Sequence, residues 1–288
     1  MTTAVLEDLL CRIERRGLGP DSCNRLRGTL VTIFNKARKA GLWQGQNPAI
    51  DTERRKKGRR VYSTLEADEV HLVLAQVDDD WRNLFATAVY TGMRKGELFA
   101  LQKIDVNMDA GTIIVRRSHD RDSTKSGHEA VVPIADALAP YLEDALEKSP
   151  NHLVFPAADG SQRSREADPQ KVLRTALKHT GLVLGYDHTC RRCKAAGTPH
   201  VERHPDDALR ICPACGMKLW PKAIPRPMRF HDLRHTTATL LLRAKVDLHR
   251  VQRVLRHSDP RLTVGTYGHL LVEDLRESIN LLPASRAG

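Results

Sequence analysis

The chain carries HDLRH at residues 231–235 and LRHSDPRLTVGTYGHL at 255–270, which supply in order a histidine, an arginine, a second histidine and a tyrosine. Far upstream, TGMRKGEL at 91–98 adds an arginine, and STKSG at 123–127 adds a lysine. Metal-free attack on a phosphodiester needs cations that neutralise the phosphate, a nucleophile, and an acid that protonates the leaving oxygen. The six candidate site residues offer these groups: Arg94, Lys125, His231, Arg234, His257 and Tyr267.

The order and spacing of these residues resemble the catalytic domain of tyrosine recombinases, the phage-integrase family. The resemblance implies that Arg94 and Arg234 hold the scissile phosphate, a task that suits the planar guanidinium fork. It also implies that Tyr267 is the nucleophile, which gives a covalent 3′-phosphotyrosine and a free 5′-hydroxyl. The ester keeps the bond energy, so religation needs no ATP, and the chemistry needs no metal or other cofactor.

The same resemblance assigns the other polar residues of the site. Lys125, in a loop, is the general acid for the 5′-oxygen, because nearby cations lower the pKa of a lysine. His231 accepts a proton or orients the phosphate, and His257 donates a hydrogen bond to a phosphate oxygen. Glu97 follows Arg94 by three residues and is therefore expected to hold the side chain of that arginine.

Apolar spacing predicts a mainly helical chain with one small antiparallel sheet, an α+β fold that matches the family's catalytic domain. WRNLFATAVYTG at 81–92 is expected to be a buried helix that ends at Gly92. The β-branched runs at 111–117 and 128–134 predict a hairpin, and helical spacing resumes from residue 136. Ser63 and Glu66 are expected to form a capping box at the start of a helix.

The chain is expected to comprise two domains and a linker. Residues 1–52 predict two helices, the second capped by Asp21 or Ser22 and stopped at Gly41, and they resemble part of the family's helical core-binding domain. The basic run ERRKKGRR at 53–60 is interpreted as a linker, either solvated or lying along a DNA backbone. Residues 61–288 form the expected tyrosine recombinase catalytic domain.

The charge of the chain favours a polyanionic partner. Lysine and arginine total 46 against 35 acidic residues, a net charge of +11. The resemblance implies double-stranded DNA as the partner, a homotetramer on that DNA, and possible accessory DNA-bending proteins. The sequence has no apolar run near the ~20 residues of a membrane span and no signal peptide, so a cytoplasmic, nucleoid-associated protein is expected.

Four of the six cysteines form two CxxC pairs, CRRC at 190–193 and CPACG at 212–216. This spacing predicts a structural Zn²⁺ held by four thiolates, in a zinc-ribbon insertion at about 186–222. Cytosolic disulfides and a dithiol redox pair are the weaker alternatives. Cys11 and Cys23 are expected to be ordinary buried residues. The expected metal ligands are Cys190, Cys193, Cys212 and Cys215.

Two other functions stay open at this point. A type IB-like topoisomerase uses the same chemistry as a monomer, although HDLRH and the short hairpin favour the recombinase. A DNA-binding protein that cleaves no strand is the second alternative, favoured by the short N-terminal region. One departure from the family pattern is Arg256, which stands where a glycine is common and adds charge beside His257.

Overall fold

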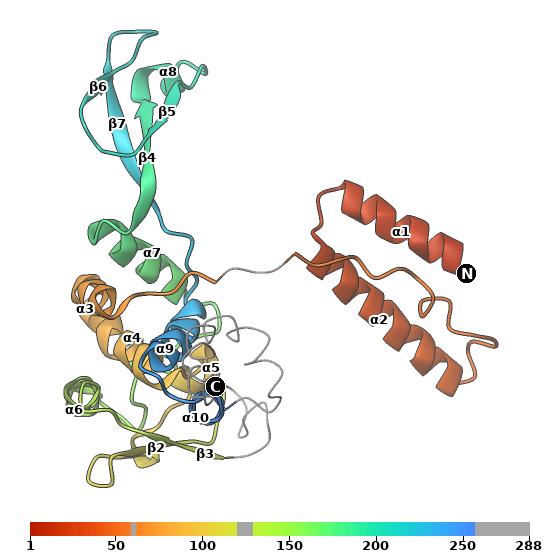
Figure 1. Cartoon of the computed structure of the whole chain (residues 1–288), viewed down its shortest axis with the longest axis horizontal. Coiled ribbons are helices and arrows are strands. Elements are labelled where there is room, and N and C mark those ends of the chain that lie inside the picture. The colour runs from red at the N-terminus through yellow and green to blue at the C-terminus, as the bar shows by residue number, and fades with distance from the viewer. Residues whose placement is uncertain (59–61, 120–128, 257–288) are drawn as a thin grey trace, which may run out of the picture. The chain divides into compact units, whose positions relative to one another are not determined.

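The computed structural model describes residues 1–58, 62–119 and 129–256. The chain divides into two compact units, Met1–Val61 and Tyr62–Gly288, and each is described here by itself. In the first unit, the helices α1 (Thr3–Arg15) and α2 (Pro20–Lys39) pack on each other (Figure 1). Their contact buries Leu6, Leu10 and Cys23. The two helices predicted in this region are confirmed.

The start of α2 differs from the sequence prediction. The helix begins at Pro20 with Gly19 as its N-cap, so Asp21 and Ser22 lie inside the first turn, and the prediction that one of them caps the helix was wrong. Proline suits this position because its missing N–H has no partner in the first turn of a helix. Gly41 follows the helix with φ +71°, the left-handed stop that was predicted.

The basic run after α2 is partly tied to the first unit. The guanidinium of Arg55 donates to Glu7 at 2.5 Å and to Glu14 at 3.1 Å, and its side chain is 8% exposed. The Asn24 side chain pairs with the backbone of Arg55, donating to its carbonyl and accepting from its amide. Arg55 is therefore neither solvated nor available to lie along a DNA backbone.

In the second unit, helix α4 (Asp79–Thr91) is the centre of the helical core. It packs against α3 (Ala67–Gln76), α6 (Ala139–Lys148) and α9 (Asp232–Arg243). One continuous apolar cluster joins these helices to α7 (Pro169–His179) and to the adjoining sheet. The mainly helical class and the buried helix that ends at Gly92 are confirmed. Two shorter helices also belong to this unit: α5 (Lys95–Phe99) and α10 (Leu248–Leu255).

Helix α3 begins three residues later than predicted. Its N-cap is Glu66, which forms a capping box with Glu69. The predicted box of Ser63 and Glu66 was wrong because Glu66 takes the role expected of Ser63. In the usual capping box, a serine or threonine occupies the N-cap position and its side chain accepts a hydrogen bond from the N3 backbone N–H. Here a glutamate takes this position, so the sequence pattern placed the helix start too early.

A three-stranded antiparallel sheet lies beside the helices, in the order β1–β2–β3. The predicted hairpin is confirmed as β2 (Thr112–Val115) and β3 (Ala130–Pro133), with Ile113 opposite Val132. The edge strand β1 (Val106–Asn107) was not predicted, because two residues are too few to give a periodic pattern. A 3₁₀ turn, Lys103–Asp105, leads into it.

Between α7 and α9 the chain forms a second, four-stranded sheet in the order β5–β4–β7–β6 (Figure 1). The sequence prediction of one sheet was wrong on this point. Gly185 has φ +135°, and a Cβ there would lie 2.7 Å from the carbonyl oxygen of His204, so the position requires glycine. The elements are β4 (Val183–Cys190), α8 (Arg191–Ala195), β5 (Val201–His204), β6 (Arg210–Ile211) and β7 (Lys218–Pro225).

Among the helices in the described ranges, none combines the length and apolar character that a membrane crossing requires.

Candidate active site and candidate metal centre

A tight turn after α4 places Arg94. Gly92 ends the helix with φ +60°, and a Cβ on it would lie 2.9 Å from the Leu255 side chain and 3.5 Å from the Thr237 hydroxyl. Only glycine fits this conformation and this spacing. The next residues reverse the chain, so that Arg94 becomes the N-cap of α5. Arg94 therefore stands at the start of a helix.

Glu97 holds Arg94, as predicted. Its carboxylate accepts from the Arg94 backbone N–H at 2.9 Å and from the Arg94 guanidinium at 2.7 Å. A second arginine, Arg256, contacts the same carboxylate at 2.8 Å. The Glu97 side chain is 2% exposed, and this burial raises the pKa of the carboxyl. The charges of Arg256 and Arg94 outweigh burial and lower the pKa below its usual value, so Glu97 is ionised.

Arg234 lies against the same turn. It sits on α9 and is buried, and its guanidinium donates to the carbonyl oxygens of Gly92 and Leu255. Arg234 thereby links the end of α4 to the end of α10. Arg234 and Gly92 are 142 residues apart in the sequence. The two predicted arginines are thus brought together: Arg234 contacts the residue two positions before Arg94.

His231 is the N-cap of α9 and lies on the same stretch of chain as Arg234. Burial, the charge of Arg234 and the weaker effects of Arg229 and Arg94 lower the pKa of His231 below its usual value. Its imidazole is therefore neutral near pH 7, the form that accepts a proton. The centroid of the His235 ring lies 5.8 Å from that of His231, and His235 stacks on Tyr62 at 3.8 Å.

A small cavity of about 260 Å³ opens beside His231. Two cations that the sequence analysis did not single out line it, Lys95 and Arg229. Arg229 pairs with the buried carboxylate of Asp232 at 2.8 Å, and Lys95 donates to the carbonyl of Arg165 at 2.7 Å. Their positions in the sequence could have indicated them, because Lys95 directly follows Arg94 and Arg229 precedes His231 by two residues. Lys125, His257 and Tyr267 lie outside the described residues.

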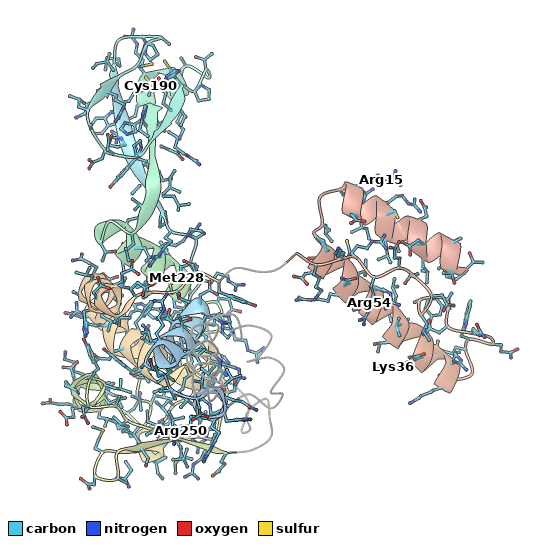
Figure 2. All side chains as sticks on the ribbon, viewed as in Figure 1. Arg15, Lys36, Arg54, Cys190, Met228 and Arg250 are labelled. Atoms are coloured by element: carbon cyan, nitrogen blue, oxygen red, sulfur yellow. The ribbon has the colours of Figure 1, made fainter. Side chains whose placement is uncertain are left out.

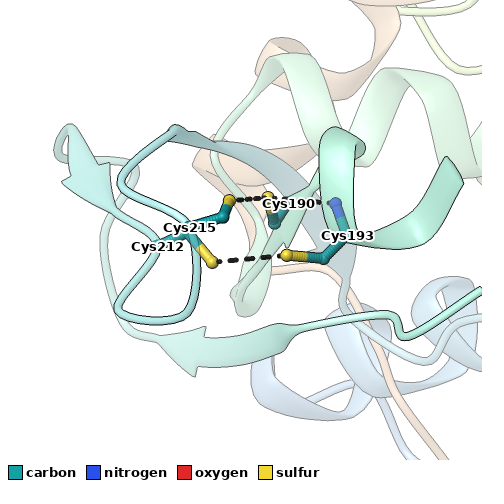
Figure 3. A group of neighbouring side chains, drawn as sticks. All are labelled: Cys190, Cys193, Cys212 and Cys215. Carbon is teal, nitrogen blue, oxygen red and sulfur yellow. Dashed lines mark hydrogen bonds between the residues drawn. The ribbon is translucent and has the colours of Figure 1, made fainter. Parts of the chain in front are cut away.

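The four cysteines of the insertion, among them the Cys190 labelled in Figure 2, meet in one cluster (Figure 3). Their sulfurs all lie within 4.8 Å of one another, with Cys190 and Cys215 at 3.4 Å and Cys193 and Cys212 at 3.8 Å. A tetrahedral shell with Zn–S bonds of about 2.3 Å spaces its sulfurs by about 3.8 Å. The cluster therefore fits a metal ion held by four thiolates.

A backbone hydrogen bond favours the thiolate at Cys190, whereas hydrogen bonding with Cys215 and Cys190 raises the pKa of Cys193 to about 12. The Cys193 amide donates to the Cys190 sulfur at 3.5 Å, and this hydrogen bond lowers the pKa of Cys190 to about 7. A lower pKa favours the thiolate, which is the form that ligates metals. The nearby histidines have other partners. Nε2 of His188 contacts the Asp206 carbonyl, while His200 and His204 both contact the carboxylate of Glu202.

The two remaining cysteines differ in burial. Cys23 is buried as expected, whereas Cys11 is partly exposed and lies 3.3 Å from the Arg55 guanidinium. The expectation that both are buried was therefore wrong for Cys11.

The family model described as "Phage integrase family" matches residues 63–205 and 210–274, more than half of the chain. The chain belongs to the phage integrase family. An integrase/recombinase of Escherichia coli is 31% identical over 223 residues, which cover 76% of this chain and 63% of that protein. The tyrosine recombinase XerC of Alcanivorax borkumensis is 24% identical over 96% of this chain and 78% of its own length.

Solved integrase structures share the fold of this phage integrase family member. The Tn1549 transposon integrase, in complex with circular intermediate DNA, matches with a TM-score of 0.69 at 15% identity, covering 98% of this chain and 85% of that one. A lambda integrase dimer bound to a core site matches with a TM-score of 0.63 at 20% identity, covering 91% and 81%. The chain spans about two thirds or less of the first curated relatives that it matches.

Proposed function

We propose that this chain is a site-specific DNA recombinase that cleaves and rejoins DNA through a covalent 3′-phosphotyrosine. The strongest support is one contact, the hydrogen bond from the Arg234 guanidinium to the Gly92 carbonyl, which brings Arg234 to the turn that carries Arg94. Two arginines from distant segments beside one neutral histidine suit a site that stabilises a phosphorane-like transition state. Family membership supports the same conclusion.

In this proposal, Tyr267 attacks the phosphorus bound by Arg94 and Arg234. The bond between the tyrosine oxygen and phosphorus forms while the bond from phosphorus to the 5′-oxygen breaks. His231 is the candidate acceptor of the tyrosine proton, and Lys125 protonates the departing 5′-oxygen. His257 donates a hydrogen bond to a phosphate oxygen. A 5′-hydroxyl from another strand reverses these steps and releases the tyrosine, so the reaction needs no ATP, metal or cofactor.

We also propose that the cysteine cluster holds a structural Zn²⁺. Cys190, Cys193, Cys212 and Cys215 would complete its shell, so that no position is left open for catalysis. The ion would stabilise the insertion at about 186–222 because it joins α8 to the loop between β6 and β7. Arg94, Arg234 and His231 are not among its ligands.

The wider arrangement of domains and partners belongs to the same proposal. Residues 1–52 act as a partial core-binding domain, 53–60 as the linker and 61–288 as the catalytic domain. The substrate is double-stranded DNA, on which four copies assemble, with accessory DNA-bending proteins where the target site requires them. A DNA substrate places the protein in the cytoplasm with the nucleoid. Solved integrases in the comparison are DNA complexes, among them a lambda integrase tetramer on a Holliday junction.

A nicked duplex that carries the attachment site, and so traps the covalent intermediate, separates this proposal from its two alternatives. The recombinase forms a covalent adduct on this duplex and little on duplexes of unrelated sequence. Equal adduct on any sequence would identify a type IB-like topoisomerase. Tight binding with no adduct would identify a DNA-binding protein that cleaves no strand. Arg94→Ala and Arg234→Ala should each lower the rate of adduct formation by about 10²–10³-fold, the effect of removing one transition-state donor.

A further inference from the structure

The insertion sheet has one closed face and one open face. Cys190 on β4 pairs with Leu219 on β7, and both are fully buried at the cysteine cluster. The neighbouring pair, Thr189 and Trp220, points to the opposite side because side chains alternate along a strand. Trp220 is 42% exposed there. The face that carries Trp220 is therefore open to solvent.

Cations surround Trp220 on this open face. Lys218 and Lys222 stand two residues either side of Trp220 on β7, so the alternation places them on the same face. The guanidinium of Arg191 lies 3.9 Å from the Trp220 ring centroid, and the Lys218 ammonium lies 4.9 Å from it. Such cation–π contacts fix the positions of flexible cationic side chains. The tryptophan therefore orders two cations at the surface.

The open face continues into a groove of about 500 Å³ between β7 and α7. Lys222 lines the groove from the sheet. Lys171, Arg174 and Lys178 line it from α7, where their spacing of three and four residues places them on one side of the helix. We call these residues the insertion tract: Lys171, Arg174, Lys178, Arg191, Lys218 and Lys222.

The acidic residues at the groove already have partners. Asp168 caps α7 by accepting from the Gln170 backbone N–H at 3.0 Å, and Asp187 pairs with Arg203 at 2.9 Å. Within the described ranges, no carboxylate lies at ion-pair distance from a residue of the insertion tract. Six cations without carboxylate partners along one surface repel one another, and an anionic ligand relieves that repulsion.

We infer that the insertion tract binds the phosphate backbone of duplex DNA, outside the site of strand cleavage. The inference rests on the proposed function, which supplies DNA as the substrate. Lys218 and Lys222 are about 13 Å apart along β7, and the α7 cations span about 10 Å. This extended row suits a ligand with evenly repeated charges, such as the DNA backbone, rather than a single compact anion. The ring of Trp220 already contacts two cations, which favours a backbone ligand over stacked, unpaired bases.

The test measures the salt dependence of binding to a fluorescein-labelled duplex of about 40 base pairs, in a Tyr267→Phe background so that cleavage cannot contribute. The slope of log K against log salt is negative, and each phosphate contact that is lost should reduce its magnitude by about 0.9. Lys222→Gln should reduce the magnitude by about 1, and the double variant Lys218→Gln/Lys222→Gln by about 2, with weaker binding in both. Lys148→Gln is the matched control, because Lys148 is an exposed lysine on α6 that pairs with Asp144.

Three results would overturn the inference. First, the slope could be the same in Lys222→Gln as in the parent. Second, Lys148→Gln could reduce the magnitude of the slope as much as Lys222→Gln does, which would make the effect one of net charge alone. Third, polyglutamate could displace the labelled duplex as effectively, per unit charge, as unlabelled DNA does, and could bind more weakly to the same variants. That result would identify an acidic protein, rather than DNA, as the ligand of the insertion tract.

Adduct formation is measured separately, in protein that keeps Tyr267. A normal adduct together with an unchanged slope in Lys222→Gln would reject the insertion tract and keep the recombinase. A slope that depends on Lys222, with no adduct, would support the insertion tract and reject the recombinase.

Discussion

The guanidinium of Arg256 and the carboxylate of Glu97 form an ion pair of 2.8 Å in which both side chains are buried, at 9% and 2% exposure. Arg256 is also the left-handed C-cap of α10, with φ +54°. A glycine at this position would permit the backbone turn but would leave Glu97 with Arg94 alone. The arginine therefore joins the end of α10 to the residue that holds Arg94.

Glu97→Gln should destabilise the second unit and slow cleavage. The amide keeps the shape of the side chain but removes the charge, which leaves Arg256 buried without its counter-ion. Breaking a buried pair costs about 3 kcal/mol, to be measured as the free energy of unfolding in urea. Asp144→Asn breaks the exposed pair with Lys148 and should cost less than about 1 kcal/mol. Equal losses in the two variants would show that burial of Glu97 has no energetic consequence.

Arg256→Gly should lower the unfolding free energy even though glycine suits the backbone. Relief of the left-handed conformation gains about 1 kcal/mol, which is less than the loss of the buried ion pair. Arg256→Lys is the control, since it keeps a cation for Glu97 and the same left-handed backbone strain. It should therefore lower stability less than Arg256→Gly. If Arg256→Gly instead raised stability, the Glu97 pair would contribute less than the backbone strain.

Stability should fall as the pH is lowered from about 6.5 to 4. Burial is the largest cause that lowers the pKa of His235, to about 4, against about 6.5 in the unfolded chain. Over this interval the unfolded state binds a proton that the folded state does not, so acid favours unfolding. Above this pH interval His235 is neutral in both the folded and the unfolded state, and below it His235 is protonated in both. The expected loss from His235 is at most about 3 kcal/mol.

His235→Phe is the variant that checks this assignment. Phenylalanine keeps a ring to stack on Tyr62 but cannot titrate. Urea unfolding at pH 7 and at pH 4.5 should therefore give a smaller difference in the variant than in the parent. Identical differences would mean that His235 does not account for the acid sensitivity. His231, whose pKa is lowered in the same direction, and carboxyls with a lowered pKa, among them Glu97 and Glu69, contribute to the part that remains.

Removal of the metal should loosen the insertion and leave the arginine site in place. Native mass spectrometry should detect one zinc ion per chain, and none in Cys212→Ser. After chelation, hydrogen exchange should rise in 183–225, whereas α4 should stay protected because it lies in a separate apolar cluster. Chelation that abolished cleavage but left folding and DNA binding intact would give the metal a catalytic role and contradict the assignment.

Local signals in the sequence were enough for much of this fold. The end of α4 at Gly92, the β2–β3 hairpin and the cysteine cluster each follow from a short pattern with a definite physical cause. The same holds for the pairing of Glu97 with Arg94, since residues three apart on a helix face each other. The catalytic roles assigned to all six candidate residues stay predictions, and Lys125, His257 and Tyr267 also lie outside the described residues.

Contacts between distant segments were not predictable. The Arg256–Glu97 pair joins residues 159 apart, and neither residue type indicates the other as its partner. The open face of the insertion sheet depends on the register between β4 and β7, which decides that Trp220 faces solvent and Leu219 the cysteines. Two CxxC pairs predict the ligands of a metal, but they do not give the register of the strands around it.

The most direct test of the central claim is to locate the covalent bond. The trapped adduct on the nicked duplex should be digested with trypsin and nuclease and sequenced by mass spectrometry. The account predicts a nucleotide joined through its 3′-phosphate to Tyr267, and its loss in Tyr267→Phe. A nucleotide on any other residue, or an undiminished adduct in Tyr267→Phe, would contradict it.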